Sequence, residues 1–225
     1  MQFCKVDVED DVFFLTLDSD DGGHNYLTLQ FMEDLRQKLV EIRGKVGVKS
    51  RGLVTVCAGG SFCEGVEYEQ SSSSEVDELA HLMAEVVRLL FDMPFPTVAA
   101  VTGDVRTSLA LALVLAHDYV AALKQASFEV PEVRDGRGDV PPYVTALLRD
   151  KAPYPLMMSK LVLQAEAMDG STMKYWYAAD TIDDPKEAVD YINKVGDGEA
   201  YVTTRKSFFP ESWKSVSEFL RDDHQ

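Results

Sequence analysis

The stretch TVAAVTGDVRTSLALALVLAHDYVAAL, residues 97 to 123, holds the alternation of patterns that decides the fold. Thr97 to Val101 are small or branched and mostly apolar, which is typical of a buried strand, and Gly103 marks a turn. The very apolar run from Leu109 to Ala116 is too short to span a bilayer and is therefore expected in the core. Tyr119 to Leu123 predicts a further strand. This order of strand, turn, helix and strand predicts an α/β fold.

The rest of the chain repeats this switch between apolar periods of about two and 3.6 residues, which indicates strands alternating with helices. Val12 to Leu17 and Leu53 to Cys57 are predicted strands, and Thr28 and Ser74 are predicted caps of two helices. The remaining predicted helices cover about residues 143–149, 156–167, 172–179, 185–194 and 211–221. No internal repeat stands out, so we predict one domain, 1–225, with a core at about 1–150 and a helical part at about 151–225.

The composition excludes several classes of partner and site. The chain has 38 acidic and 22 basic residues, and nucleic acid and anionic membranes are not expected partners because they require clustered Lys and Arg. Cys4, Cys57 and Cys63 are odd in number and lie in or beside apolar segments, which favours a reducing compartment over a disulfide framework. Cys57, Cys63 and His81 lack the paired spacing of a zinc site, so no metal is expected.

Two further segments flank the opening stretch: SFCEGVEY at 61 to 68 and SFEVPEV at 127 to 133. In this order the three segments together resemble the crotonase, or enoyl-CoA hydratase/isomerase, superfamily. The similarity is greatest to plant Δ3,Δ2-enoyl-CoA isomerases and extends over nearly the whole chain, including LQAEAMDGSTMKYWYAADTID at 163 to 183. The resemblance implies a ClpP/crotonase-like fold of stacked ββα units with a C-terminal helical subdomain, and a homotrimer.

The resemblance also implies an enoyl-CoA Δ-isomerase-like enzyme, which moves a C=C bond from the β,γ to the α,β position of a carbonyl compound through a dienolate. That reaction needs a base for the α proton, two N–H donors for the dienolate oxygen, and return of the proton at the γ carbon. Glu132 stands four residues before Gly136, as does the glutamate that shuttles the proton in the family's isomerases. Glu132 is therefore the predicted acid and base. Without the resemblance, a loop residue that pairs with Arg134 or Arg137 is the simpler interpretation.

The sequence favours isomerisation over hydration. The other glutamate of the family's hydratases would fall near Ala110 or Leu111, and neither side chain can activate water. A single glutamate in an apolar pocket is made more basic by desolvation, and one carboxylate can deliver the same proton to either end of an allyl system.

The resemblance assigns the two N–H donors to the backbone. The first falls on Val66, which follows the glycine of the 61–68 segment, and the second on Leu109 or Ala110 at the start of the apolar helix. The segment DVRTSL at 104 to 109 replaces the family's small and glycine residues, and bulky Leu109 would narrow the carbonyl site. Glu64 and Glu67 flank the first donor and would oppose a negative charge there unless both face solvent.

The resemblance places other residues near a substrate. His24 and Asn25 would line the acyl-CoA entrance, although a solvated turn is the simpler interpretation. Apart from the resemblance, Tyr143 could line a pocket mouth, although helical core packing is the simpler interpretation. The predicted substrate-binding residues are His24, Asn25, Cys63, Glu64, Gly65, Ala110 and Tyr143. His117-Asp118-Tyr119 is not a triad, because neighbouring side chains near a strand start diverge.

The substrate class stays open between two alternatives. Coenzyme A is a polyanion, yet the candidate cations Lys49, Arg51 and Lys124 form no cluster. A diverged isomerase of a small non-CoA enone, for example a plant monoterpene ketone, is one alternative to a 3-enoyl-CoA isomerase. A non-catalytic crotonase homologue with a binding or assembly role is another. No cofactor is expected beyond the CoA that a substrate would carry.

The ends of the chain inform the expected location. No basic and apolar signal opens the sequence, and Asp222 to Gln225 do not resemble the Ser-Lys-Leu peroxisomal signal. We therefore expect a soluble cytoplasmic protein, with the peroxisome as the alternative that the family implies.

Overall fold

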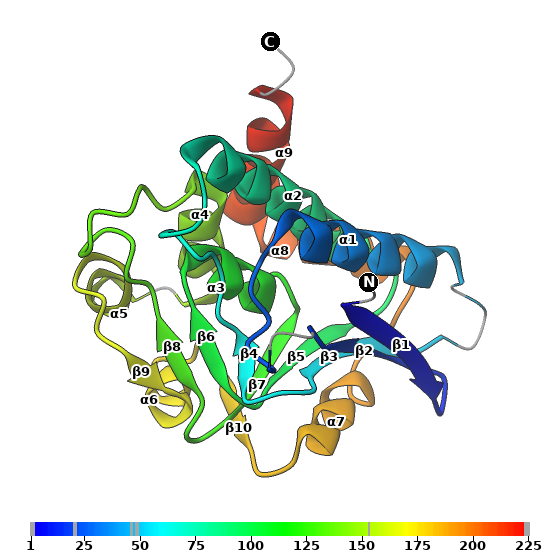
Figure 1. The fold of residues 1–225 in the computed structure, drawn as a ribbon. Helices are drawn as coiled ribbons and strands as arrows, with labels where there is room; N and C mark the ends of the chain where they lie inside the picture. Colours follow the sequence, from blue (N-terminus) through cyan, green and yellow to red (C-terminus); the bar gives the residue numbers. More distant parts are fainter. Residues whose placement is uncertain (1–2, 20–21, 46, 48–49, 153, 223–225) are drawn as a thin grey trace.

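The structure, a computed structural model, describes residues 3–19, 22–45, 47, 50–152 and 154–222. Helices α1 (Leu29–Gly44) and α2 (Ser73–Phe91) run side by side on one side of the main sheet, and α7 (Val189–Ile192) lies on the other (Figure 1). Strands and helices alternate through the first two thirds of the chain, which confirms the predicted α/β class.

The larger sheet has six strands in the order β1-β2-β3-β5-β7-β10. Strands β1 and β2 form an antiparallel hairpin, and the other neighbours are parallel. The strands are Cys4–Glu9 (β1), Val12–Leu17 (β2), Gly52–Cys57 (β3), Thr97–Val101 (β5), Tyr119–Leu123 (β7) and Asp180–Ile182 (β10). The predicted strands are confirmed, except that β3 begins one residue earlier than predicted.

After each of the strands β3, β5 and β7 of the larger sheet, the next strand along the chain belongs to the smaller sheet. Its order is β4-β6-β8-β9, with β4 at Ser61–Cys63, β6 at Asp104–Arg106, β8 at Ser127–Glu129 and β9 at Met168–Asp169. Helices α2, α3 (Ser108–Leu115) and α4 (Pro142–Lys151) follow β4, β6 and β8. Each unit is therefore strand, strand, helix, as the ββα prediction states.

The helix ends show where the sequence pattern was incomplete. Thr28 caps α1 through the Phe31 N–H as predicted, whereas Ser72, not Ser74, caps α2 through the Glu75 N–H. The predicted helix at 156–167 is a short α5 (Pro155–Met158) followed by a π-helical turn, Ser159–Leu163. The helix predicted at 172–179 corresponds to α6 (Gly170–Tyr175). The helix predicted at 185–194 is a 3₁₀ turn (Pro185–Ala188) followed by α7, and the one predicted at 211–221 is α9 (Pro210–Asp222).

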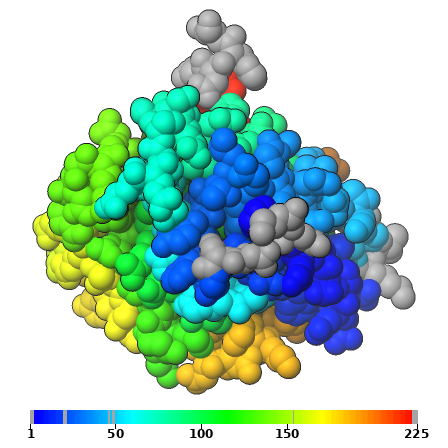
Figure 2. Space-filling model, in the orientation of Figure 1, coloured from blue at the N-terminus to red at the C-terminus, as the bar shows by residue number. Residues whose placement is uncertain are grey.

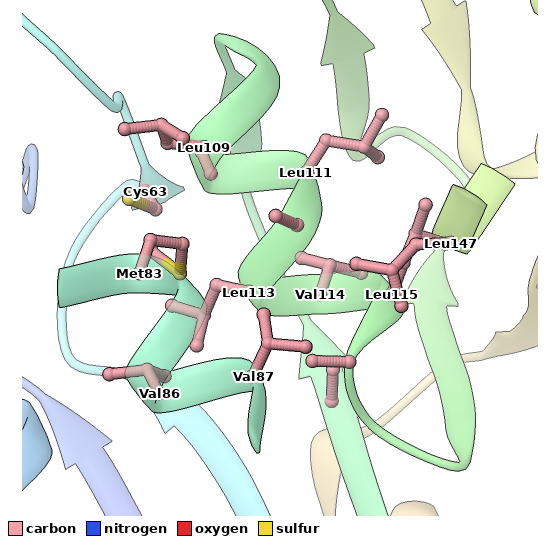
Figure 3. Packing of buried hydrophobic residues seen from close by; sticks show 14 of the residues in the cluster. Cys63, Met83, Val86, Val87, Leu109, Leu111, Leu113, Val114, Leu115 and Leu147 are labelled. Atoms are coloured by element: carbon pink, nitrogen blue, oxygen red, sulfur yellow. The ribbon is translucent and has the colours of Figure 1, made fainter. Parts of the chain in front are cut away.

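Helix α3 lies in the centre of the core. All eight of its residues are buried, which is why its sequence is apolar on every side. Figure 3 shows Leu109, Leu111, Leu113 and Leu115 of α3 with side chains of α2 and α4 around them. No helix within the described residues combines the length and the apolar character needed to cross a membrane.

Helix α8 (Glu199–Phe208) was not predicted, and Arg205 is the residue of this helix that is buried. The Arg205 side chain, 3% exposed, attaches it to the core. Its Nε and Nη2 donate to the Asp118 carboxylate at 2.6 and 2.8 Å, and its Nη1 donates to the carbonyls of Leu90, Phe91 and Met93. Long-range hydrogen bonds therefore fix this helix.

Candidate active site

The candidate site lies at the N-terminal end of α3, where the loops after β4 and β6 touch. The Thr107 N–H donates to the Glu129 carbonyl of β8 at 3.0 Å, which fixes the turn before α3. Thr107 has φ 75° and ψ 158°, a region almost restricted to glycine that costs other residues about 1–3 kcal/mol. Gly65 has φ +76°, and a Cβ there would lie 1.8 Å from Thr107 Oγ1. Position 65 therefore requires glycine.

Glu132 follows β8 and directs its side chain to the start of α3. It is completely buried. Its Oε1 accepts hydrogen bonds from the Ser108 N–H at 2.5 Å and from the Tyr68 hydroxyl at 3.0 Å. Its Oε2 is buried and has no hydrogen-bond partner within the described residues. The N-terminus of α3 favours the negative charge through its free N–H groups, so the site holds a buried carboxylate with one oxygen unused.

Tyr68 is the side-chain partner of that carboxylate. Burial first, and then the charge of Glu132, raise the pKa of the Tyr68 hydroxyl. The phenol therefore stays protonated at neutral pH and acts as a donor. Sequence reasoning missed Tyr68 and Ser108, because both contacts join positions far apart in the chain.

The predicted backbone donors lie beside these residues. Val66 and Leu109 are 4% and 2% exposed, and Ala110 is completely buried. The first N–H groups of a helix lack partners within the helix. In α3, the Ser108 N–H donates to Glu132, and Leu109, whose N–H is the predicted oxyanion donor, is the next residue. The assignment of the Val66 and Leu109 N–H groups as donors stays a prediction.

The charge of Glu64 is balanced within the protein. The Ser61 hydroxyl donates to its Oε1 at 2.6 Å, and the Arg106 Nε lies 3.1 Å from its Oε2. Glu67 instead accepts a hydrogen bond from the Gln70 amide at 2.8 Å. The Glu64 side chain is 12% exposed and so does not face solvent, but its ion pair with Arg106 reduces the repulsion that it would exert on a nearby negative charge.

A pocket of about 360 Å³ opens beside Val66, Thr107 and Pro131. On the face in Figure 2, the cyan and teal chain after β4 lies beside the green chain after β8. Tyr68 lines this pocket, whereas Glu132 does not reach it. Its other lining groups include five carboxylates and three guanidiniums: Glu64, Glu67, Glu69, Glu129, Asp135, Arg106, Arg134 and Arg137.

The three guanidiniums of this pocket are each paired with a carboxylate. Arg106 lies 3.1 Å from Glu64 and 3.0 Å from Asp104. Arg134 pairs with Glu129 at 3.4 Å and with Asp135 at 2.7 Å, and Arg137 lies 3.7 Å from Asp135. The pocket is therefore acidic overall.

His24, Asn25 and Cys63 lie next to this region, in and beside the chain between β2 and α1. His24 is half exposed, stacks on Tyr26 at 5.7 Å and has its Nδ1 3.8 Å from Glu64. Asn25 is completely buried, and its amide donates to the carbonyls of Ser61 and Phe62. The Cys63 thiol donates to the Asn25 carbonyl at 3.3 Å. These contacts give Asn25 and Cys63 a structural role in holding the loop against β4.

Tyr143 lies in the core rather than at a pocket mouth. It is completely buried, its hydroxyl donates to the Ala80 carbonyl at 2.9 Å, and its ring packs against Phe219 with centroids 5.1 Å apart. Ala110 and Leu111, the positions considered for a second acid, are also buried and carry apolar side chains.

The polar groups after α3 form a structural network. His117 Nδ1 donates to the Leu113 carbonyl at 2.9 Å, and its Nε2 lies 2.7 Å from the Thr55 hydroxyl. Burial lowers the pKa of His117 to about 4, so the ring is neutral. The described residues contain no group of three His, Cys, Asp or Glu that could hold a metal.

The cations considered for coenzyme A do not gather at the site. Lys124 pairs with Asp183 at 3.1 Å, and Arg51 is hydrogen-bonded to Asn193. Lys49 lies outside the described residues. The cations that line the candidate pocket are the three paired arginines.

Comparison with known sequences identifies relatives along most of the chain. The family model "Enoyl-CoA hydratase/isomerase" matches residues 8–189. The Arabidopsis thaliana protein "Enoyl-CoA delta isomerase 1, peroxisomal" is 27% identical over 220 residues, which cover 92% of this chain and 90% of the relative. Arabidopsis "Enoyl-CoA delta isomerase 3" is also 27% identical, with 95% of this chain and 94% of that protein covered.

Solved structures share the fold at lower identity. An enoyl-CoA isomerase from Mycobacterium tuberculosis superposes with a TM-score of 0.84 at 16% identity, covering 98% of this chain and 96% of that chain. An enoyl-CoA hydratase from Mycobacterium marinum gives 0.83 at 18% identity, with 97% and 96% covered. At these identities the similarity shows the crotonase fold alone. Together with the family match, it establishes that this chain belongs to the enoyl-CoA hydratase/isomerase family.

Proposed function

We propose that this protein moves a C=C bond from the β,γ to the α,β position of a carbonyl compound, with Glu132 as its acid and base. The observation that carries the proposal is the buried Glu132 carboxylate at the start of α3, with Oε2 free of partners in the described chain. The resemblance places the second glutamate of the family's hydratases near Ala110 or Leu111. Neither side chain can activate water, which supports isomerisation over hydration. The printed names of the Arabidopsis relatives agree with this reaction.

In the proposed mechanism, a substrate enters past Tyr68, which lines both neighbouring pockets while Glu132 lines neither, and Glu132 Oε2 then removes its α proton. The electron pair of that C–H bond moves into a dienolate, whose oxygen accepts hydrogen bonds from the Val66 and Leu109 N–H groups. The carboxylic acid formed at Glu132 then protonates the γ carbon, and the carboxylate is restored. One proton changes place within the substrate, and no water or cofactor is consumed.

A small enone without CoA is the second candidate substrate class, and the charge of the pocket favours it. Five carboxylates and three paired guanidiniums line the space beside Val66. A CoA thioester brings phosphate groups, which unpaired Lys or Arg side chains usually bind. An uncharged ketone meets no such repulsion. The family's usual substrate, a 3-enoyl-CoA, remains the first candidate because family membership supports it.

The proposal is tested with Glu132→Gln and a substrate panel of 3-enoyl-CoA thioesters and free β,γ-unsaturated ketones. Loss of the general base should lower kcat about 10³-fold or more, within the range known for such groups. Because glutamine removes a buried charge, the urea midpoint of unfolding should stay equal or rise. Full activity in this variant would remove Glu132 from the mechanism. A wild-type protein that turns over no member of the panel would favour the non-catalytic alternative.

Assembly and location are proposals that derive from family membership. We expect a homotrimer, which light scattering coupled to size-exclusion chromatography would detect as a mass three times that of the chain. Cytoplasmic location stays a prediction, since two of the Arabidopsis relatives are named as peroxisomal.

A further inference from the structure

Tyr68 separates the proposed base from the open space around it. Its hydroxyl reaches from the loop after β4 to Glu132 Oε1, 3.0 Å away. The Tyr68 side chain lines both the pocket of about 360 Å³ and a second one of about 550 Å³, and Glu132 lines neither. The side chain that contacts the carboxylate therefore also borders both pockets, as do Glu69 and Arg137.

Two donors act on the same oxygen of Glu132. The Ser108 N–H and the Tyr68 hydroxyl both bond to Oε1, and Oε2 has no partner among the described residues. A free carboxylate rotates about its last torsion in a broad, roughly two-fold potential, so its two oxygens exchange places. Two donors on one oxygen prevent that exchange. The donor from α3 is a backbone group, which leaves the tyrosine as the side chain that completes the arrangement.

We infer that Tyr68 is a positioning residue, which holds the Glu132 carboxylate so that Oε2 alone transfers the proton. This inference rests on the proposed isomerase function. The O–H···O hydrogen bond also favours the charged carboxylate over the neutral acid. Tyr68 therefore sets the direction of the base.

The test is Tyr68→Phe in the full chain, assayed with the best substrate of the panel. This variant keeps the ring and removes the hydroxyl. We expect kcat to fall about tenfold while KM changes less than about twofold, because the base is misdirected and binding is not changed. The acidic limb of the pH–rate profile should move upward by about 1–2 pH units, which corresponds to a hydrogen bond to a charged group.

Tyr191→Phe is the matched control. Burial, and then the neighbouring Asp180 carboxylate, raise the pKa of the Tyr191 hydroxyl, and Tyr191 belongs to α7, on the far side of the larger sheet from α1 and α2. The control should keep the wild-type kcat, KM and pH profile. If Tyr68→Phe also keeps them, or lowers kcat without moving the profile, the positioning role is overturned.

A readout without turnover separates this inference from the proposed function. In protein labelled with ¹³C at glutamate carboxyl groups, the resonance that is lost in Glu132→Gln reports this carboxylate. Its titration midpoint should rise by about 1–2 pH units in Tyr68→Phe. An unchanged midpoint overturns the inference. A wild-type protein without isomerase activity overturns the proposed function instead, and the midpoint still decides the role of the Tyr68 hydroxyl.

Discussion

The two ends of α3 hold two buried carboxylates whose surroundings differ. At the C-terminal end, Asp118 Oδ2 accepts from the Thr97 N–H, the Thr97 hydroxyl and Arg205, and Oδ1 accepts from Arg205. At the N-terminal end, Glu132 receives two uncharged donors on one oxygen and none, within the described chain, on the other.

We interpret Asp118 as a structural carboxylate and Glu132 as the carboxylate that the proposed function uses. Buried polar groups normally have partners, because an unpaired group loses its hydration without compensation. Asp118 follows this rule, and its bonds connect β5, β7 and α8. Glu132 departs from this rule, and under the proposed function its Oε2 is the atom that accepts the substrate proton. We therefore expect changes around Asp118 to affect stability, and changes around Glu132 to affect catalysis.

The largest expected effect on stability is that of Arg205→Met, which leaves the Asp118 charge buried without its cation. Breaking one partner of a buried pair costs about 3–5 kcal/mol in the free energy of unfolding. Urea denaturation measures this loss, and the folded fraction should keep its kcat. Lys206→Met is the control from the same helix, since its pair with Asp92 is more exposed and contributes about 1 kcal/mol or less. Equal losses in the two variants would contradict the distinction.

His117 should make stability depend on pH. Burial lowers its pKa to about 4 in the folded protein, from an ordinary value of 6.5. Between these values the unfolded chain binds a proton that the folded chain does not. The contribution of the neutral, buried His117 to the free energy of unfolding is therefore complete above pH 6.5. It falls by about 3 kcal/mol in total as the pH falls toward 4. Urea unfolding from pH 7 to 4.5 measures the slope, which should be smaller in His117→Gln. Equal slopes in both proteins would show that other groups cause it.

Thr107→Gly tests the N-terminal end of α3, beside the candidate site, and has the smallest expected effect. Thr107 holds a backbone conformation that costs about 1–3 kcal/mol, and the greater freedom of glycine in the unfolded chain offsets up to about 1 kcal/mol of the relief. We expect a gain of about 1 kcal/mol in unfolding free energy. Thr203→Gly, inside α8 with ordinary helical geometry, should lose a few tenths of a kcal/mol instead. A loss in Thr107→Gly would mean that its side-chain contacts outweigh the strain.

Much of the fold could be predicted from the sequence, because strands β2, β5 and β7 and helix α1 carry local apolar periods and a clear cap. Helix α8 could not be predicted, because Arg205 attaches it to groups more than 80 positions earlier in the chain. The start of α2 falls in a run of four serines, 71 to 74, where residue type does not distinguish the cap.

The candidate site was predictable to a smaller extent. The Glu132 assignment depended on a resemblance that a short motif can carry. The contacts of Glu132 with Tyr68 and Ser108 could not be predicted in this way, because these residues lie 64 and 24 positions away in the sequence. The Ser108 N–H faces the carboxylate because Thr107 takes a glycine-like backbone conformation, which a threonine in the sequence does not suggest.

The contact between Gly65 and Thr107 has a consequence for protein engineering. A side chain at position 65 would overlap Thr107 Oγ1 and the Arg106 carbonyl. The loop that carries Val66 and the turn that starts α3 therefore move together, and substitutions at their contact would change the distance between Val66 and Leu109, the two proposed oxyanion donors. A mutant library intended to redirect substrate choice should keep this junction constant and vary the outer wall of the pocket, at Tyr26, Glu67 and Glu69.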